Sequence, residues 1–112
     1  MKVLNTYLVN EVTDGSFTTK ELSIEHMAGF SVSYVSGGFA GTVKIQGSND
    51  PVNLSEGEKI VDWVDIASSS EALTNGDKEL LNFPDAFYRF IRVDVTETTP
   101  GALKVAVNAK GV

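Results

Sequence analysis

The sequence contains no cysteine and only one histidine. The lack of thiols excludes disulfides, a thiolate nucleophile and cysteine-based zinc or iron–sulfur sites. The single imidazole, His26, lies between two predicted strands, where a turn is expected rather than a catalytic pocket. The glycine motif of dinucleotide-binding proteins, the phosphate-binding loop and the HExxH motif are also missing. These absences predict a protein that is not an enzyme and that has no catalytic residues and no cofactor.

Basic residues and long apolar runs are scarce as well. The sequence has 9 lysines and arginines but 15 aspartates and glutamates. The resulting net charge of -6 disfavours binding to nucleic acid or to anionic membranes. The polar residues Asn5 and Thr6 interrupt the apolar residues near the N-terminus, so the sequence has no apolar run long enough for a signal-peptide core. No stretch approaches the roughly 20 apolar residues of a membrane-spanning helix. We therefore expect a protein made in a cytoplasm that binds neither nucleic acid nor membrane.

The sequence does contain a series of short segments in which apolar and polar residues alternate, as is typical of half-buried strands. The predicted strands cover residues 4–12, 21–25, 30–35, 42–46, 60–66, 87–96 and 102–109. Turn-forming pairs such as Gly37-Gly38 and Pro100-Gly101 separate them. Over 112 residues this pattern predicts an all-β protein, a single antiparallel β-sandwich domain spanning residues 1–112. We expect about seven to eight strands in a jelly-roll or immunoglobulin-like arrangement, with little helix.

Some local features of this sandwich can also be predicted. The glycines at 37–38 predict a hairpin that pairs the strands at 30–35 and 42–46. Helix is expected only as a turn or two, at residues 71–73 and 79–81. Arg89 and Arg92 lie three apart on one predicted strand and so face opposite sides, with Asp85 or Asp94 as expected partners. The predicted core contains Val43, Ile45, Trp63, Phe90, Ile91 and Val93.

Charge is distributed unevenly along the chain. Residues 49–85 carry nine acidic and two basic side chains, whereas the rest of the chain carries six acidic and seven basic ones. A polarised surface of this kind suits contacts between subunits, although acidic loops are also common as ordinary solvated surface. The residues expected to form an interface are Glu56, Glu58, Asp62 and Asp65 on the acidic side and Arg89, Arg92, Lys104 and Lys110 on the basic side.

Two ligand-binding alternatives remain open from the sequence. Trp63 and Tyr34 could form a stacking platform for a sugar, with Asn49 and Asp50 beside it. The loop that contains Asn49 and Asp50 also offers several oxygen ligands suitable for calcium. Their spacing does not match a calcium-binding loop, so an ordinary polar turn is the simpler interpretation. No metal ligands are therefore predicted.

Four segments together resemble a family of known proteins. In order, they are residues 41–50 (GTVKIQGSND), 63–66 (WVDI), 86–93 (AFYRFIRV) and 101–105 (GALKV). A strand ending in a Ser-Asn-Asp turn, then a tryptophan strand, then an arginine-bearing strand resembles the small β-sandwich proteins of tailed-bacteriophage virions. The same order is similar to discoidin-like, or galactose-binding-like, modules. The resemblance covers approximately residues 28–110.

The resemblance to phage sandwich proteins implies a structural protein of the virion, such as a capsid decoration protein, a head fibre or a tail-associated subunit. Its partners would be other virion proteins and further copies of itself in a homo-oligomer. Its location would be the virion, after synthesis in the host cytoplasm. A carbohydrate-binding module that adheres to a host-surface glycan is the alternative, since carbohydrate-binding sandwiches use exposed aromatic residues.

Overall fold

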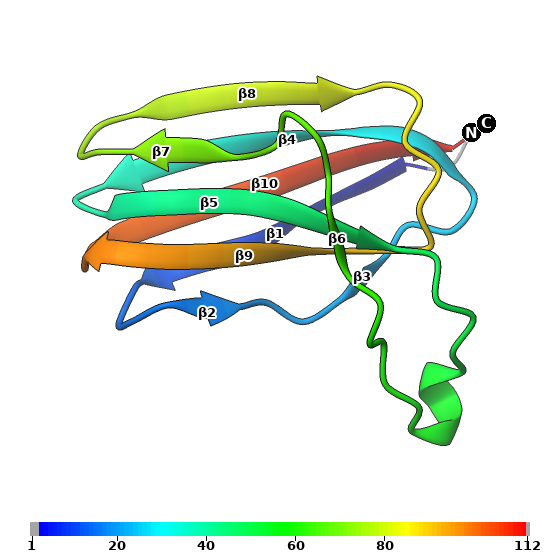
Figure 1. Cartoon of the computed structure of the whole chain (residues 1–112). Helices are drawn as coiled ribbons and strands as arrows, with labels where there is room; N and C mark the ends of the chain where they lie inside the picture. Colours follow the sequence, from blue (N-terminus) through cyan, green and yellow to red (C-terminus); the bar gives the residue numbers. More distant parts are fainter. Residues whose placement is uncertain (1–2, 112) are drawn as a thin grey trace.

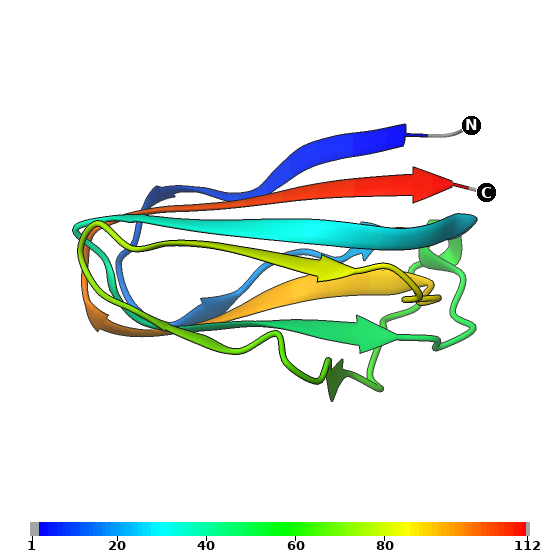
Figure 2. The same ribbon diagram turned by 90° about the horizontal axis from the view of Figure 1, so that it is seen from above.

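The computed structural model describes residues 3–111 and consists of two antiparallel β-sheets packed face to face (Figure 1, Figure 2). The first sheet has the strand order β1 (Val3–Val12), β10 (Ala102–Gly111), β4 (Met27–Gly37) and β8 (Lys78–Phe83). The second sheet is built on β9 (Phe90–Thr99) and β5 (Ala40–Ser48). Short strands extend it, β2 (Phe17–Thr18) and β3 (Leu22–Ser23) beside β9, and β6 (Val64–Asp65) and β7 (Glu71–Leu73) beside β5. The predicted all-β sandwich is confirmed.

The chain passes from one sheet to the other at most of its connections. β1, β4, β8 and β10 lie in the first sheet, and the strands that fall between them in chain order lie in the second. β2 with β3 occupies one strand position and β6 with β7 another, so ten strands fill eight positions. This order is the jelly-roll topology, one of the two predicted arrangements, and differs from the immunoglobulin-like one.

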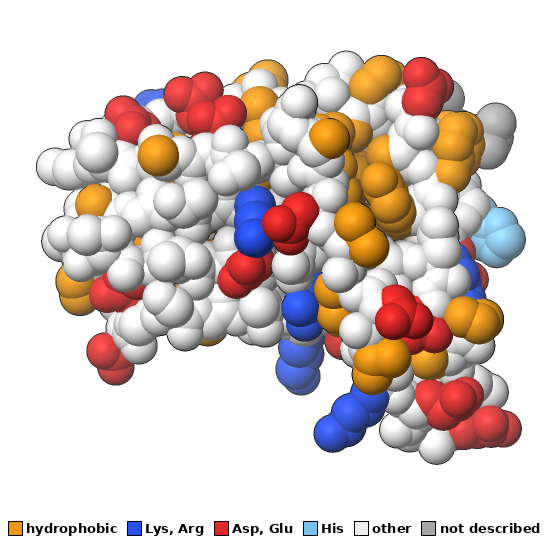
Figure 3. Space-filling model, in the orientation of Figure 1, with side chains coloured by type: hydrophobic (Ala, Val, Ile, Leu, Met, Phe, Trp, Pro, Cys, Tyr) orange, Lys and Arg blue, Asp and Glu red, His pale blue; other side chains and the backbone are white. Residues whose placement is uncertain are grey.

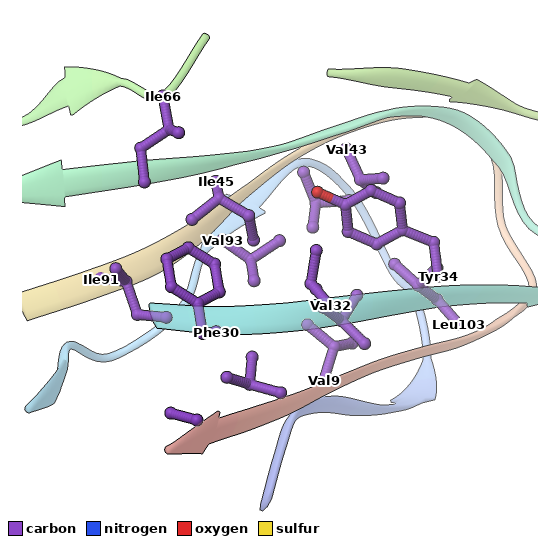
Figure 4. Packing of buried hydrophobic residues seen from close by; sticks show 14 of the residues in the cluster. Val9, Phe30, Val32, Tyr34, Val43, Ile45, Ile66, Ile91, Val93 and Leu103 are labelled. Atoms are coloured by element: carbon purple, nitrogen blue, oxygen red, sulfur yellow. The ribbon is translucent and has the colours of Figure 1, made fainter. Parts of the chain in front are cut away.

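The core forms from the apolar side of each strand pattern (Figure 4). Five of the predicted core residues are at most 4% exposed, namely Val43, Ile45, Phe90, Ile91 and Val93. Leu103, Val105 and Val107 are fully buried from the opposite sheet, on the single face of β10 that their alternation predicts. Burial of these two facing layers away from water provides the main stabilisation of the sandwich.

Trp63 is not part of this core, and the strand predicted at 60–66 forms only at its end. Val64 and Asp65 pair with β5, whereas residues 57–63 form an irregular loop. The pairing covers only Gln46 and Gly47 of β5, so the chain before Val64 lies outside the sheet. Trp63 consequently lies half-buried at the surface, and Ile66, which was not among the predicted core residues, is buried.

The predicted hairpin between residues 30–35 and 42–46 is wrong, because β4 and β5 belong to different sheets. Phe39 lies in the connection and is fully buried, which carries the chain across the core instead of back along β4. Gly38 next to it has φ +106°, a conformation that favours glycine. A Cβ atom on Gly101 would clash with the Gly38 carbonyl carbon, so this crossover packs tightly against the β9–β10 turn.

The two segments expected as short helices are strands. β7 pairs with β5, and its Leu73 side chain is buried. β8 pairs with β4, and the ring centroids of Phe83 and Phe30 lie 5.0 Å apart. Pairing and burial override the local helix propensity at both places. Within residues 3–111, η1 (Leu54–Glu56) is the only helical element, and no helix is long and apolar enough to cross a membrane.

Tyr34 connects the two sheets through a hydrogen bond inside the core. Its side chain is fully buried, and its hydroxyl donates to the Ser69 carbonyl oxygen at 2.8 Å. Ser69 lies between β6 and β7, and its own hydroxyl donates to the Ile66 carbonyl oxygen and accepts from the Ile45 amide. Burial, with a smaller contribution from Glu71, raises the pKa of the Tyr34 phenol, so the hydroxyl keeps the proton that it donates.

Tyr34→Phe should destabilise the protein, because it leaves the buried Ser69 carbonyl oxygen without its donor. We expect the free energy of unfolding to fall by about 1–2 kcal/mol, measured by urea unfolding followed by circular dichroism. Tyr7→Phe, at an exposed position of β1, is the matched control and should change the free energy by less than about 0.5 kcal/mol. Equal stability of the two variants would contradict the role assigned to this bond.

Candidate functional site

The connection between β5 and β6 projects from the sandwich as an acidic loop, defined here as residues 49–63 (Figure 1, Figure 3). It carries four acidic side chains and one basic side chain. Its own polar groups hold its shape: Asn53 caps η1 by accepting a hydrogen bond from the Ser55 amide. The Glu58 carboxylate accepts from the Asn53 amide, and the Asp50 carboxylate accepts from the Val61 amide. The loop is therefore ordered by contacts within itself.

Arg89 attaches the base of the acidic loop to the sandwich. Its Nε atom pairs with the Glu25 carboxylate at 2.5 Å, and its Nη1 atom donates to the Asp50 carbonyl oxygen at 2.9 Å. Its backbone amide donates to the Asn49 side-chain oxygen at 3.1 Å. Glu25 is therefore the partner of Arg89, and neither Asp85 nor Asp94, the two candidates expected from the sequence, takes this position. Arg89, Asn49 and Asp50 act together as an anchor within the chain.

Trp63 and Arg92 stack beside the acidic loop. The guanidinium carbon of Arg92 lies 4.4 Å from the centre of the Trp63 ring, which is within cation–π distance. Arg92 Nε also donates to the side-chain oxygen of Gln46 at 2.7 Å, which fixes the guanidinium over β5. Lys59, Glu21 and the stack line a shallow groove of about 240 Å³. The sequence offered no signal for this stack, because Trp63 and Arg92 are far apart in the chain.

The four residues predicted as a sugar site do not come together. Tyr34 is fully buried with its hydroxyl bonded inside the core, so it cannot be an exposed stacking platform. Its position follows from the alternation along β4, which turns Tyr34 inward with Val32. Asn49 and Asp50 bind groups at the base of the acidic loop and do not line the groove beside Trp63. Trp63 alone of the four keeps an exposed portion next to a groove.

Charged side chains pair across the outer face of the second sheet. Asp94 and Lys44 lie directly opposite each other in β9 and β5, and their charged atoms are 3.6 Å apart. Asp94 therefore pairs with Lys44, whereas the sequence had suggested an arginine as its partner. Lys44 also binds the Asp65 carboxylate at 2.9 Å, and Gln46 donates to the same carboxylate. These hydrogen bonds hold the pKa of Asp65 below its ordinary value and, in turn, raise the pKa of Lys44.

The outer face of the first sheet has a different character. Strand register and burial place Lys104 and Lys110 of β10 and Lys78 of β8 on this face, which we call the lysine face. The other outward positions of the four strands are occupied by Ala, Val, Leu, Tyr, Ser, Asn and Gly. Within residues 3–111, these outward positions include no acidic side chain. The lysine face is therefore positively charged on a protein of net charge -6.

The residues predicted as an interface are divided among different environments. On the acidic loop, Glu56, Glu58 and Asp62 are exposed, and on the lysine face Lys104 and Lys110 are exposed. Asp65, Arg89 and Arg92 instead have partners within the chain. Sequence reasoning missed Lys78 as a member of the lysine face, because no strand was predicted there and the next residues, 79–81, were expected to form a helical turn.

His26 lies in an exposed turn before β4, with φ +66°. In the part of the chain that the structure describes, no three His, Asp or Glu side chains converge as metal ligands. The features that the described residues do present are the acidic loop, the Trp63–Arg92 stack and the lysine face.

The fold defines the chain as a jelly-roll β-sandwich, and known proteins share that architecture. Neither a protein-family model nor a curated protein matches the chain. Among solved structures it is similar to SPBc2 prophage-derived protein YomS, with 16% identity and a TM-score of 0.66 over 96% of this chain and 92% of that one. It is also similar to a chain from Bacillus endospore appendages, described as disulfide-linked pili, with 8% identity and a TM-score of 0.51 over 98% and 88% of the two chains. At such identities these likenesses establish a shared fold.

Lys44→Met should raise the pKa of the Asp65 carboxyl toward its ordinary value of 3.8. The Lys44 hydrogen bond is the largest cause of the lowering, and the Gln46 bond should keep part of it. Because the folded-state pKa is the lower one, this contact stabilises the fold above the unfolded pKa and is lost as the pH falls through the folded pKa. Titration of the carboxyl carbon by NMR measures the shift. Lys104→Met on the lysine face is the control, and an unchanged Asp65 pKa in Lys44→Met would contradict the assignment.

Proposed function

We propose that the protein is a non-enzymatic structural subunit of a bacteriophage virion. In this proposal it acts through contacts with its own copies and with other virion proteins. The observation that carries the proposal is the separation of charge between the acidic loop and the lysine face. No ion pair joins these two surfaces within residues 3–111, so each is available to a neighbouring molecule.

Opposite charges on separate surfaces favour association between molecules. The acidic loop projects beyond the sandwich, whereas the lysine face lies along the sheet of four strands (Figure 1). The projecting loop of one copy can therefore approach the lysine face of the next, or an acidic neighbour can occupy the same face. Complementary potentials of this kind steer association and exclude partners of the wrong charge. The exposed carboxylates of Glu56 and Asp62 have no hydrogen-bond partner within the described chain that would compete with a neighbouring molecule.

The fold is compatible with a virion protein. A prophage-derived protein has a similar fold over nearly the whole length of both chains, and jelly rolls occur widely in viral capsid proteins. The sequence resemblance to sandwich proteins of tailed phages supports the same location. Capsid decoration, a head fibre and a tail-associated position all fit this proposal.

Lys104→Glu/Lys110→Glu should abolish the salt-sensitive association of the protein, because it reverses the charge of the lysine face. Size-exclusion chromatography with light scattering, across protein and salt concentrations, measures the assemblies. Mixing this variant with Glu56→Lys/Asp62→Lys should restore association, since each variant then supplies the charge that the other has lost. Lys20→Glu, at an exposed lysine of a loop, is the matched control and should behave like the parent.

Two results would contradict the proposal. One is an association that is independent of salt and unchanged by the charge reversals. The other is the absence of the chain from phage particles purified from a host that encodes it, measured by quantitative mass spectrometry. Many copies per particle are expected.

A carbohydrate-binding role is a second candidate, favoured by the partly exposed Trp63 beside a polar groove. Trp63 is the single tryptophan, so its fluorescence reports directly on this groove. If a glycan stacks there, titration with a glycan panel should shift the emission, and Arg92→Ala should alter the affinity by changing the stacked partner. Unchanged emission across the panel would exclude this role for the groove, and Tyr88→Phe serves as a control away from it.

A further inference from the structure

β1 is a long strand at the edge of the first sheet. It has ten residues and pairs with β10 on one side only. Figure 2 shows no other element beyond it. An edge of this kind presents backbone N–H and C=O groups that can pair with another strand.

The other edges of the sandwich are short or charged. β2 and β3 have two residues each, and β6 and β7 have two and three. β8 has six residues and begins with Lys78 and Glu79. Short edge strands and edge charges are the means by which soluble proteins prevent unwanted pairing. β1 lacks both along most of its length.

The side chains of β1 add to this difference. Residues 3–10 contain no charged residue and no proline. Three large apolar side chains are mostly exposed along the strand: Val3 at 58%, Tyr7 at 55% and Val12 at 72%. Two copies with a net charge of -6 each can therefore approach along this strand without like charges facing each other. The edge is suited to a partner that covers both the backbone and these apolar groups.

The irregularity in β1 determines which side chains face which way. β1 contains one extra residue relative to β10, at Leu8. As a result, the side chains that point to the lysine-face side change from odd to even positions at Leu8. They are Val3, Asn5 and Tyr7 before Leu8, and Asn10 and Val12 after it. A regular strand that pairs antiparallel with β1 can match outward side chains with outward ones in only one half of β1. In the other half it would align outward side chains with inward ones.

We propose that β1 pairs antiparallel with β1 of a second copy, in a two-fold dimer that aligns Val3 with Val12 of that copy. In this register Asn5 is aligned with Asn10, so outward side chains meet outward side chains in both halves, apart from Tyr7 and the extra residue Leu8 at the centre. Glu11, the one charged residue of β1 from Val3 onward, is aligned with Leu4 and meets no like charge. This register pairs all ten residues of β1 with those of a second copy, and that self-complementarity favours a second copy as the occupant. Closed two-fold pairs of this kind are the commonest oligomers.

The dimer would also enlarge the surface described above. Antiparallel pairing at the edge makes one continuous sheet of eight strands, in which the two lysine faces lie on the same side. A partner with repeated acidic groups would then meet both faces at once, which raises its effective affinity. The pairing itself depends on the backbone and side chains of β1 and not on the three lysines of the lysine face or on the acidic loop.

The test compares two double variants at the aligned ends. Val3→Lys/Val12→Lys places like charges opposite each other twice, whereas Val3→Lys/Val12→Glu places opposite charges there. At about 1 M salt, charges are screened over about 3 Å, which removes the association between the acidic loop and the lysine face. Sedimentation under these conditions should still show the parent as a dimer. At lower salt the like-charge variant should dimerise at least about tenfold more weakly than the opposite-charge variant. Leu80→Lys, an equally exposed position on β8, is the control and should leave the dimer intact.

Hydrogen exchange on the unmodified protein is a second measurement that does not depend on any variant. Exchange of the β1 amides should slow as protein concentration rises, while the β8 amides should not change. A parent that is monomeric at high salt, or equal dimerisation of the two double variants, would overturn this inference. Either result leaves the proposed function untouched, because that function is tested by the salt-sensitive association.

Discussion

The hydrogen bond from Tyr34 to Ser69 is the contact on which the placement of the acidic loop depends. It crosses the core from β4 to the segment between β6 and β7, and Ser69 is bound in turn to Ile45 and Ile66. The end of the acidic loop is thereby held against β5. Its start is held by Arg89, which binds Asp50 and Glu25. A buried hydrogen bond resists disruption because separating its partners inside the core leaves both unsatisfied.

The jelly-roll topology decides which charges can meet. Lys44, Asp65 and Asp94 are neighbours on the second sheet and pair with one another. The lysines of β8 and β10 are on the outer face of the other sheet, beyond the apolar core. The same alternation that buries one side of every strand therefore separates the mixed charges of the second sheet from the purely basic lysine face. The molecule has two distinct surfaces as a consequence of its core.

Several elements could be predicted because their signals are local. The alternation along β10 gave its buried face, and the same was true of β4, β5 and most of β9. β7 and β8 were mistaken for helices, because three-residue apolar patterns do not distinguish the two structures without a pairing partner. The predicted hairpin at 37–38 is wrong for a similar reason: a glycine pair marks a change of direction, and only the strand pairing, together with the burial of Phe39, shows that the chain changes sheets. The size of Trp63 predicted a core position, but Trp63 precedes the short strand that pairs with β5 and lies outside the sheet.

The sequence by itself determined the all-β class, the main strands and most of the core residues, together with the excess of acidic charge. These properties follow from composition and from the two-residue period of a strand, which act over a few neighbouring positions. The tertiary structure decided the pairing order, the partners of Arg89 and Arg92 and the gathering of three lysines on one face. It also decided that β1 is an open edge. These properties depend on contacts between residues distant in the chain, which the jelly-roll crossings create and which no local pattern encodes.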